Sequence, residues 1–312
     1  MEEGQAAFDM TRDHGKINRR EFLQSISAGA TWASGLGAAG KSSASPLAEA
    51  LDASSAPRAP NLSETMHTLK VGASEFSVRV VGDPDALFRY VVLHGDEETA
   101  PLATEMHLKL HPGVMIQLVN PRKRWVTFKL PGLPYTYDFD PNRIFSRAGI
   151  EKNVRALNRR TRPSRYPRLF EEVEKFRGQF LKLLLGSRPP DLAVIAAHNN
   201  STSPRSDFSF ETFVNSRGYF PGVEAMQYKR SQSPFNLFIV TESAVYDELA
   251  RRGLNVVLEN AELAHDDGSL SVFCGRERIR YANIETRQGE LARQIDMLDA
   301  VREAWASRPP SQ

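Results

Sequence analysis

Cysteine is almost absent from this chain. Cys274 is the only one among 312 residues, which excludes a disulfide within the chain and any cysteine-rich zinc site. A lone thiol could still serve as a nucleophile. The surrounding SLSVFCG segment, however, resembles a strand, where a cysteine is usually a small, buried apolar residue. We expect Cys274 to have that packing role.

Excess charge and long apolar runs are also lacking. The 40 basic and 38 acidic residues leave a net charge of +2, so there is no strong electrostatic demand for nucleic acid or a membrane surface. The basic run RALNRRTRPSRYPR, residues 155–168, has no RNA- or DNA-binding motif beside it, and we interpret it as a solvated, turn-rich loop. No segment predicts a stable membrane span. Neither a Gly-rich phosphate loop nor a G-x-S-x-G motif is present.

The first 60 residues differ in composition from the rest. Arg19 and Arg20 stand just before Phe22 and Leu23, and a weakly apolar Gly/Ala-rich run and a stretch of small residues follow. This order is typical of an export signal, and the paired arginines resemble a twin-arginine signal. We therefore predict that residues 1–60 are an export signal and disordered linker, that the twin-arginine export machinery is a partner, and that the protein is periplasmic or secreted. A disordered amphipathic tail is the alternative.

From residue 61 onward, strand-like and helix-like segments alternate. Short apolar runs predict buried strands; they include LFRYVVL, GVMIQLVN, PDLAVIAA and NLFIVT. Helical spacing is clearest in RLFEEVEKFRGQFLKLLL, and KRWVTFKL with YTYDF predicts a hairpin. The alternation predicts that residues 61–312 form one α/β domain, with a single mixed, mostly parallel sheet and helices on both faces.

Polar side chains stand where three predicted strands end. His94 ends LFRYVVL and is followed by Glu97. His198 ends PDLAVIAA, and Glu285 ends RYANI. Ligands of open α/β sheets bind outside the carboxyl ends of the strands. Two histidines and a glutamate suit catalytic zinc, which keeps one position open for water, and a separate carboxylate can take and return a proton. The H-x-x-E spacing alone is a weak signal, because a lone histidine at a strand end is more often structural.

Four segments, in order, resemble the zinc carboxypeptidase superfamily, which includes succinylglutamate desuccinylases and aspartoacylases. LHGDEETA is similar to the H-x-x-E segment of that family, and FDPNRIF to its D-x-N-R-x-F segment. AAHNN resembles the strand that carries the third zinc ligand, and RYANIETRQG the strand that carries the catalytic glutamate. The order of the blocks is more specific than any one of them. Together the four segments span residues 94–285, which is most of the chain after the predicted signal.

The resemblance implies one Zn²⁺ per chain, bound by His94, Glu97 and His198. It implies that Glu285 is the general base and then the general acid. Asn142 and Arg143 would hold a substrate carboxylate. The last role also makes chemical sense alone, because a guanidinium pairs with a carboxylate through two parallel hydrogen bonds.

The sequence departs from the family pattern at two places. NPRKR, residues 120–124, stands where peptidases of the family commonly have Asn-Pro-Asp-Gly. Arg122 and Arg124 are both candidates for polarising the scissile carbonyl, and we favour Arg124. The substrate-capping tyrosine has no secure equivalent; Tyr281 shares a strand face with Glu285 and is the candidate, although core packing would explain it equally.

Some assignments around the motif stay open. Glu98 replaces Glu97 as a ligand if the loop register differs, and Asp96 is a candidate for supporting a histidine. The histidines outside the motif are interpreted as surface, capping or loop residues; they are His107, His111 and His265.

The sequence thus predicts an exported zinc hydrolase that cleaves an amide bond near a substrate carboxylate, such as a metallocarboxypeptidase or amidase acting on small peptides. A deacylase of small N-acyl amino acids is one alternative. A non-catalytic binding protein of the same fold is the other.

Overall fold

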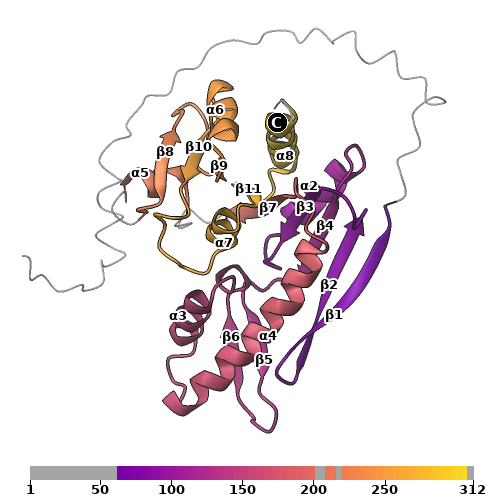
Figure 1. Cartoon of the computed structure of the whole chain (residues 1–312), viewed down its shortest axis with the longest axis vertical. Helices are drawn as coiled ribbons and strands as arrows, with labels where there is room; N and C mark the ends of the chain where they lie inside the picture. The colour runs from indigo at the N-terminus through magenta and orange to yellow at the C-terminus, as the bar shows by residue number, and fades with distance from the viewer. Residues whose placement is uncertain (1–61, 201–207, 216–219, 308–312) are drawn as a thin grey trace, which may run out of the picture. The chain divides into compact units, whose positions relative to one another are not determined.

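A nine-stranded sheet dominates the described part of the chain, residues 62–200, 208–215 and 220–307 of a computed structural model (Figure 1). The predicted signal, with Arg19 and Arg20, lies outside the described residues. The strand order is β1-β2-β4-β3-β7-β11-β9-β10-β8. The strands are β1 (Glu64–Val71), β2 (Ser74–Gly82), β3 (Phe88–Val92), β4 (Val114–Val119), β7 (Ala193–Asn200), β8 (Val223–Gln227), β9 (Leu237–Val240), β10 (Val256–Glu259) and β11 (Arg280–Arg287).

The centre of this sheet is parallel. β4, β3, β7 and β11 run in one direction, and β9 pairs with β10 in parallel as well. Antiparallel pairs join β1 to β2, β2 to β4, β11 to β9 and β10 to β8. A separate antiparallel hairpin forms from β5 (Val126–Lys129) and β6 (Thr136–Phe139), as the sequence predicts. The predicted mixed α/β sheet is therefore confirmed.

Helices cover both faces of the sheet. Side chains of β3 and the residue after it alternate between two apolar cores, Val91 and Leu93 in one, Tyr90 and Val92 in the other. The first core includes α3 (Arg147–Leu157), α4 (Tyr166–Leu185) and α7 (Leu270–Arg276). The second includes α2 (Thr99–Leu108), α6 (Ser243–Arg251) and α8 (Leu291–Ala306). A short helix, α5 (Phe210–Asn215), packs in a third, small cluster, and 3₁₀ turns span Pro141–Arg143 and Pro163–Arg165.

The amphipathic pattern of α4 is confirmed by its burial. The predicted stripe is fully buried and consists of Leu169, Val173, Phe176, Phe180 and Leu184. Phe176 packs edge-on against Phe76 of β2, at 6.3 Å between ring centroids, and against Phe139 of β6, at 5.3 Å. These aromatic contacts fix α4 against both the sheet and the hairpin. None of the described helices is long and apolar enough to cross a membrane.

The strand predicted around Cys274 is wrong, because SLSVFCG begins a helix, α7. The Ser269 side chain accepts a hydrogen bond from the backbone N–H of Val272 and so caps the helix N-terminus. Leu270 and Cys274, four residues apart, are buried on one face. The run is short and apolar, so alternation and helical spacing look alike in the sequence. The packing role expected for Cys274 agrees with its complete burial.

Other differences concern weakly apolar segments. β1 and β8 are edge strands without an apolar run, and neither was predicted; β1 lies inside the predicted domain, residues 61–312. The basic run 155–168 is not simply a loop, since it contains the end of α3, a 3₁₀ turn and the start of α4. Arg155 there lies over the rings of Tyr166 and Phe170, at 4.7 and 5.0 Å.

The surface role expected of His107 is also wrong. His107 is fully buried on the face of α2 that packs against the sheet and α8. Its Nε2 lies 2.7 Å from the hydroxyl of Tyr90. Burial lowers the pKa of His107 to about 4, so the imidazole is neutral at pH 7. The helical pattern predicted α2 itself, but His107 belongs to its inner face.

A buried arginine closes the C-terminal end of α4. Arg89 of β3 donates from Nη1 to the carbonyl of Leu184 at 2.6 Å, and from Nη2 to that of Pro84 at 3.3 Å. The last carbonyls of a helix lack partners within the helix and carry the negative end of its dipole. Gly186 lets this guanidinium approach, because its φ is +51° and an added Cβ would lie 3.0 Å from two nitrogens of Arg89.

We predict that Arg89→Met lowers the free energy of unfolding by about 2–3 kcal/mol, because buried carbonyls lose a charged donor. Urea unfolding followed by circular dichroism measures the change. Arg251→Met is the matched control: its side chain is 71% exposed and pairs with Glu248, so its loss should cost less than about 1 kcal/mol. Equal losses in the two variants would contradict the capping role.

Candidate metal centre

Three neighbouring parallel strands bring the predicted site residues together. β3, β7 and β11 are adjacent, so their carboxyl ends meet at one edge of the sheet. His94 stands two residues beyond β3, and Glu285 of β11 is paired in register with His198 of β7. Both strands continue past these residues, to Asn200 and Arg287, so His198 and Glu285 lie within their strands rather than after them.

The carboxylate of Glu97 lies between the two histidines. Its Oε1 is 2.8 Å from Nδ1 of His94, and its Oε2 is 2.8 Å from Nδ1 of His198. All three side chains are buried. Burial alone would lower the pKa of His94, but the charge of Glu97 and a hydrogen bond to Asp140 raise it to about 9. Burial alone would raise the pKa of Glu97, yet the two histidines hold it well below its usual range.

Asp140 contacts the cluster and was not among the predicted site residues. It directly follows β6, and its Oδ1 lies 2.9 Å from Nε2 of His94 and accepts a hydrogen bond from the backbone N–H of Asn142. A carboxylate on the outer nitrogen fixes the orientation of the imidazole and leaves Nδ1 toward Glu97. Asp140 belongs to the FDPNRIF segment, which was already part of the predicted site. The carboxylate predicted to support a histidine was instead Asp96, which is exposed.

The structure brings Glu97, and not Glu98, to the two histidines. The Glu98 side chain is 64% exposed and points away from the histidines, toward Arg122. Gly95 fixes this register, because a Cβ there would lie 1.6 Å from the carbonyl oxygen of Asn120. The backbone of Gly95 also pairs with residues 122 and 123 through two hydrogen bonds. The loop that carries His94 and Glu97 is thus pressed against residues 120–124.

The same close approach separates the two candidate arginines. Nη1 of Arg124 lies 3.2 Å from Oε1 of Glu97, and its Nε lies 3.7 Å from Oδ2 of Asp140. Arg122 has a positive φ of 58° and an 89% exposed side chain. Arg124, not Arg122, lines the cavity with the histidines.

Glu285 is buried beside the cluster. Its Oε1 accepts a hydrogen bond from Nδ2 of Asn283 at 3.1 Å. Burial raises the pKa of Glu285, and the negative charge of Glu97 adds to this effect while His198 opposes it. A carboxyl group with a raised pKa exchanges a proton more readily near neutral pH.

A cavity of about 550 Å³ opens over the cluster and holds the other predicted site residues. Its lining includes His94, Glu97, His198, Glu285, Arg124, Asn142, Arg143 and Tyr281. The Asn142 side chain accepts a hydrogen bond from the backbone N–H of Leu270, and Nη1 of Arg143 donates to the carbonyl of Asn142. Tyr281 touches the cavity but is only 2% exposed and belongs to an apolar core. Core packing therefore accounts for most of its surface.

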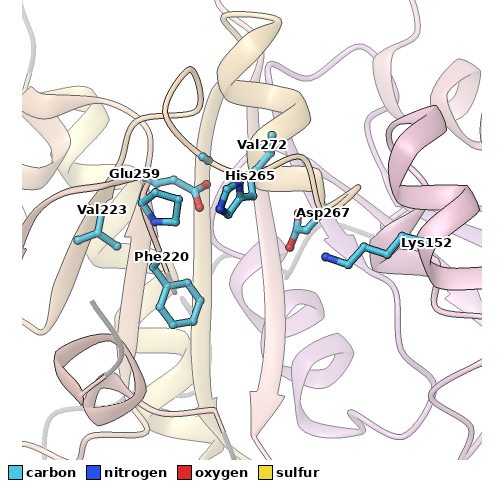
Figure 2. Close-up of a pocket in the computed structure, with 10 residues that line it drawn as sticks. Lys152, Phe220, Val223, Glu259, His265, Asp267 and Val272 are labelled. Carbon is cyan, nitrogen blue, oxygen red and sulfur yellow. The ribbon is translucent and has the colours of Figure 1, made fainter. Parts of the chain in front are cut away.

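A second hollow of about 400 Å³ lies next to this cavity and shares Phe220, Glu259 and Asp267 with it. Figure 2 shows Glu259, His265 and Asp267 among the side chains that line this hollow. Nε of Arg143 lies 3.7 Å from Oδ2 of Asp267, where the two spaces meet. The polar lining thus continues from Asp267, beside Arg143, into the second hollow.

The side chain of Asn199, next to His198 in β7, links the site to two helices. Asn199 accepts a hydrogen bond from the backbone N–H of Ala100 in α2 and donates to Gln294 of α8, at 2.8 and 2.9 Å. Gln294 in turn donates to the carbonyl of His198 at 3.2 Å. Both helices therefore brace the strand that presents His198.

The donor set fits a divalent transition metal. One ligand atom from each of His94, Glu97 and His198 lies within 4.8 Å of the other two. Two imidazole nitrogens and one carboxylate are a donor set of catalytic zinc sites. Nε2 of His198 is buried without a hydrogen-bond partner among the described residues, so the polar contact of this imidazole runs through Nδ1, toward Glu97.

Comparisons with known proteins find solved structures of low similarity. No protein-family model and no curated protein matches the chain. Similar solved structures include a protein of Shewanella denitrificans assigned as a metallopeptidase, with 12% identity and a TM-score of 0.38 over 78% of this chain and 83% of that one. An aspartoacylase family protein of Mesorhizobium loti has 12% identity and a TM-score of 0.35 over 79% and 68%.

Murein-tripeptide amidase MpaA of Escherichia coli O157 has 9% identity and a TM-score of 0.36, over 79% of this chain and 93% of the amidase. Identities and TM-scores this low assign no activity to the chain, so its chemistry has to be inferred from the site.

We predict that Asp140→Ala weakens zinc binding about 10- to 100-fold, because the outer nitrogen of His94 loses the carboxylate that orients the ring. Competition with a chelating dye measures the affinity. Asp96→Ala is the matched control, because Asp96 lies in the same loop but its side chain is exposed. An unchanged affinity in a folded Asp140→Ala variant would refute the supporting role.

Proposed function

We propose that the chain is an exported, zinc-dependent hydrolase that cleaves an amide bond next to a carboxylate of its substrate. The observation that carries this proposal is the convergence of Glu97 on both histidines, with Glu285 beside them. Arg143 lines the same cavity. Export rests on the signal-like sequence around Arg19 and Arg20, and periplasmic or secreted peptides would then be within reach.

In this proposal His94, Glu97 and His198 hold the zinc ion. Bound zinc lowers the pKa of water to about 7 and polarises a carbonyl group. The protein already supplies buried, oriented donors, and Asp140 fixes one of them from outside. The closeness of Glu97 to both imidazoles is consistent with ligands that share one cation.

Glu285 moves the proton. Its carboxyl group takes a proton from the attacking water and returns it to the leaving nitrogen. Burial raises its pKa, and Asn283 holds one oxygen, so the other oxygen remains available for the transfer. The pairing of Glu285 with His198 across two strands keeps this group close to the scissile bond.

Arg143 and Asn142 bind the substrate carboxylate. The Arg143 guanidinium donates to the carbonyl of Asn142 and lies near Asp267. Its side chain is still 38% exposed toward the cavity, which leaves donors for two parallel hydrogen bonds to a carboxylate. Arg124, 3.2 Å from Oε1 of Glu97, stabilises the negative oxygen that develops on the scissile carbonyl.

A screen of the zinc-loaded protein against small peptides and N-acyl amino acids tests this function. We expect hydrolysis in one of the two classes, which also decides between a peptidase and a deacylase. Glu285→Gln should lower kcat by about 10²- to 10⁴-fold with the zinc content unchanged. Arg143→Met should act mainly through a higher KM, and Arg122→Met, whose side chain is solvated, should leave both constants unchanged.

A zinc-loaded protein that hydrolyses neither class would favour the non-catalytic binding protein. So would a Glu285→Gln variant as active as the wild type in any weak reaction that is found. Binding of the same compounds, measured by calorimetry on the wild type and Arg143→Met, would then show whether the cavity serves recognition alone.

A further inference from the structure

A second group of side chains that can bind a metal lies between α2 and α8, on the face of the sheet that these two helices cover. It consists of His107 in α2, His111 one turn further along the chain, and Asp299 in α8. Nδ1 of His107 lies 2.8 Å from Oδ1 of Asp299, and Nε2 of His111 lies 3.1 Å from the same oxygen. The proposed function uses none of these residues.

The contact between His107 and Asp299 is close but is not a hydrogen bond. Within the described part of the chain, neither Nδ1 of His107 nor Oδ1 of Asp299 has a hydrogen-bond partner, although the atoms are 2.8 Å apart and buried. The atoms are close enough for a hydrogen bond, but the imidazole nitrogen is not directed toward the oxygen as a hydrogen bond requires. Leaving a buried donor and acceptor unsatisfied is unfavourable. A cation between these atoms would satisfy both of them.

His107 is held by its other nitrogen. Nε2 lies 2.7 Å from the hydroxyl of Tyr90, which is itself fully buried. This contact fixes the ring and leaves Nδ1 toward Asp299. Histidines that bind metals usually have such a partner on the outer nitrogen, and Asp140 provides one for His94 in the first cluster.

We propose that His107, His111 and Asp299 form a second, structural site for a divalent transition cation such as Zn²⁺. Bonds of 2.0–2.2 Å in a tetrahedral site place ligand atoms about 3.3 Å apart. The observed separations of 2.8 and 3.1 Å reach this value with shifts of a few tenths of an ångström. The side chains of His111 and Asp299 are 34% and 36% exposed, so the cation has a path from solvent.

The cation would fasten α2 to α8. These are the two helices that brace the strand of His198 through Asn199 and Gln294. Arg302 of α8 lies nearby, with its guanidinium over the ring of Phe88 and on the carbonyl of Pro112. Its positive charge opposes a cation, so we expect this site to be weaker than the first one.

Zinc titration of the full chain, stripped of metal, tests the second site in a His198→Ala background, where the first site is disabled. We expect His198→Ala to bind one Zn²⁺ per chain and to gain thermal stability from it. His198→Ala/His111→Ala should bind at least tenfold more weakly and lose the gain. His198→Ala/His67→Ala is the matched control and should behave like His198→Ala, because His67 is an exposed histidine of β1.

Absence of zinc binding by folded His198→Ala, or equal binding after His111→Ala, would overturn this second site. If His198→Ala does not fold, wild type and His111→Ala replace it, and the zinc content should fall from two per chain to one. An unchanged content would again overturn the proposal. Failure of the first zinc site would look different, because the wild type would then bind one Zn²⁺ per chain that His111→Ala loses and His198→Ala keeps.

Discussion

The contact on which the site depends is the sharing of one buried carboxylate by two imidazoles. Glu97 meets His94 three residues away and His198 from a strand 101 residues further along. A buried carboxylate without partners would be strongly unfavourable, so the site requires β3 and β7 to be neighbours. The parallel centre of the sheet provides this arrangement, and β11 adds Glu285 at the same edge.

Backbone contacts hold this carboxylate in its register. Gly95 lies so close to the carbonyl of Asn120 that no side chain fits, and this closeness places Arg124 beside Glu97. Behind the site, Asn199 and Gln294 join β7 to α2 and α8. The site therefore depends on both faces of the sheet, with Asp140 on one and α2 and α8 on the other.

The sequence predicted elements with strong patterns and missed those without one. α4 was predictable because its stripe repeats over five turns, and β3 and β7 because they are apolar runs between turns. β1 and β8 are edge strands in which apolar and polar residues neither alternate regularly nor form an apolar run, so no periodicity marks them. The ligand set was suggested by strand ends and by family resemblance. The contact of Asp140 with His94 spans 46 residues, which spacing within a motif cannot reveal.

The central claim is that Glu97, and not its neighbour, completes a metal site with the two histidines. Zinc content after dialysis, compared among the wild type, Glu97→Gln and Glu98→Gln, tests it most directly. We predict that Glu97→Gln loses one equivalent relative to the wild type, whereas Glu98→Gln, with its solvated side chain, loses none. Equal zinc content in all three folded proteins would contradict the account.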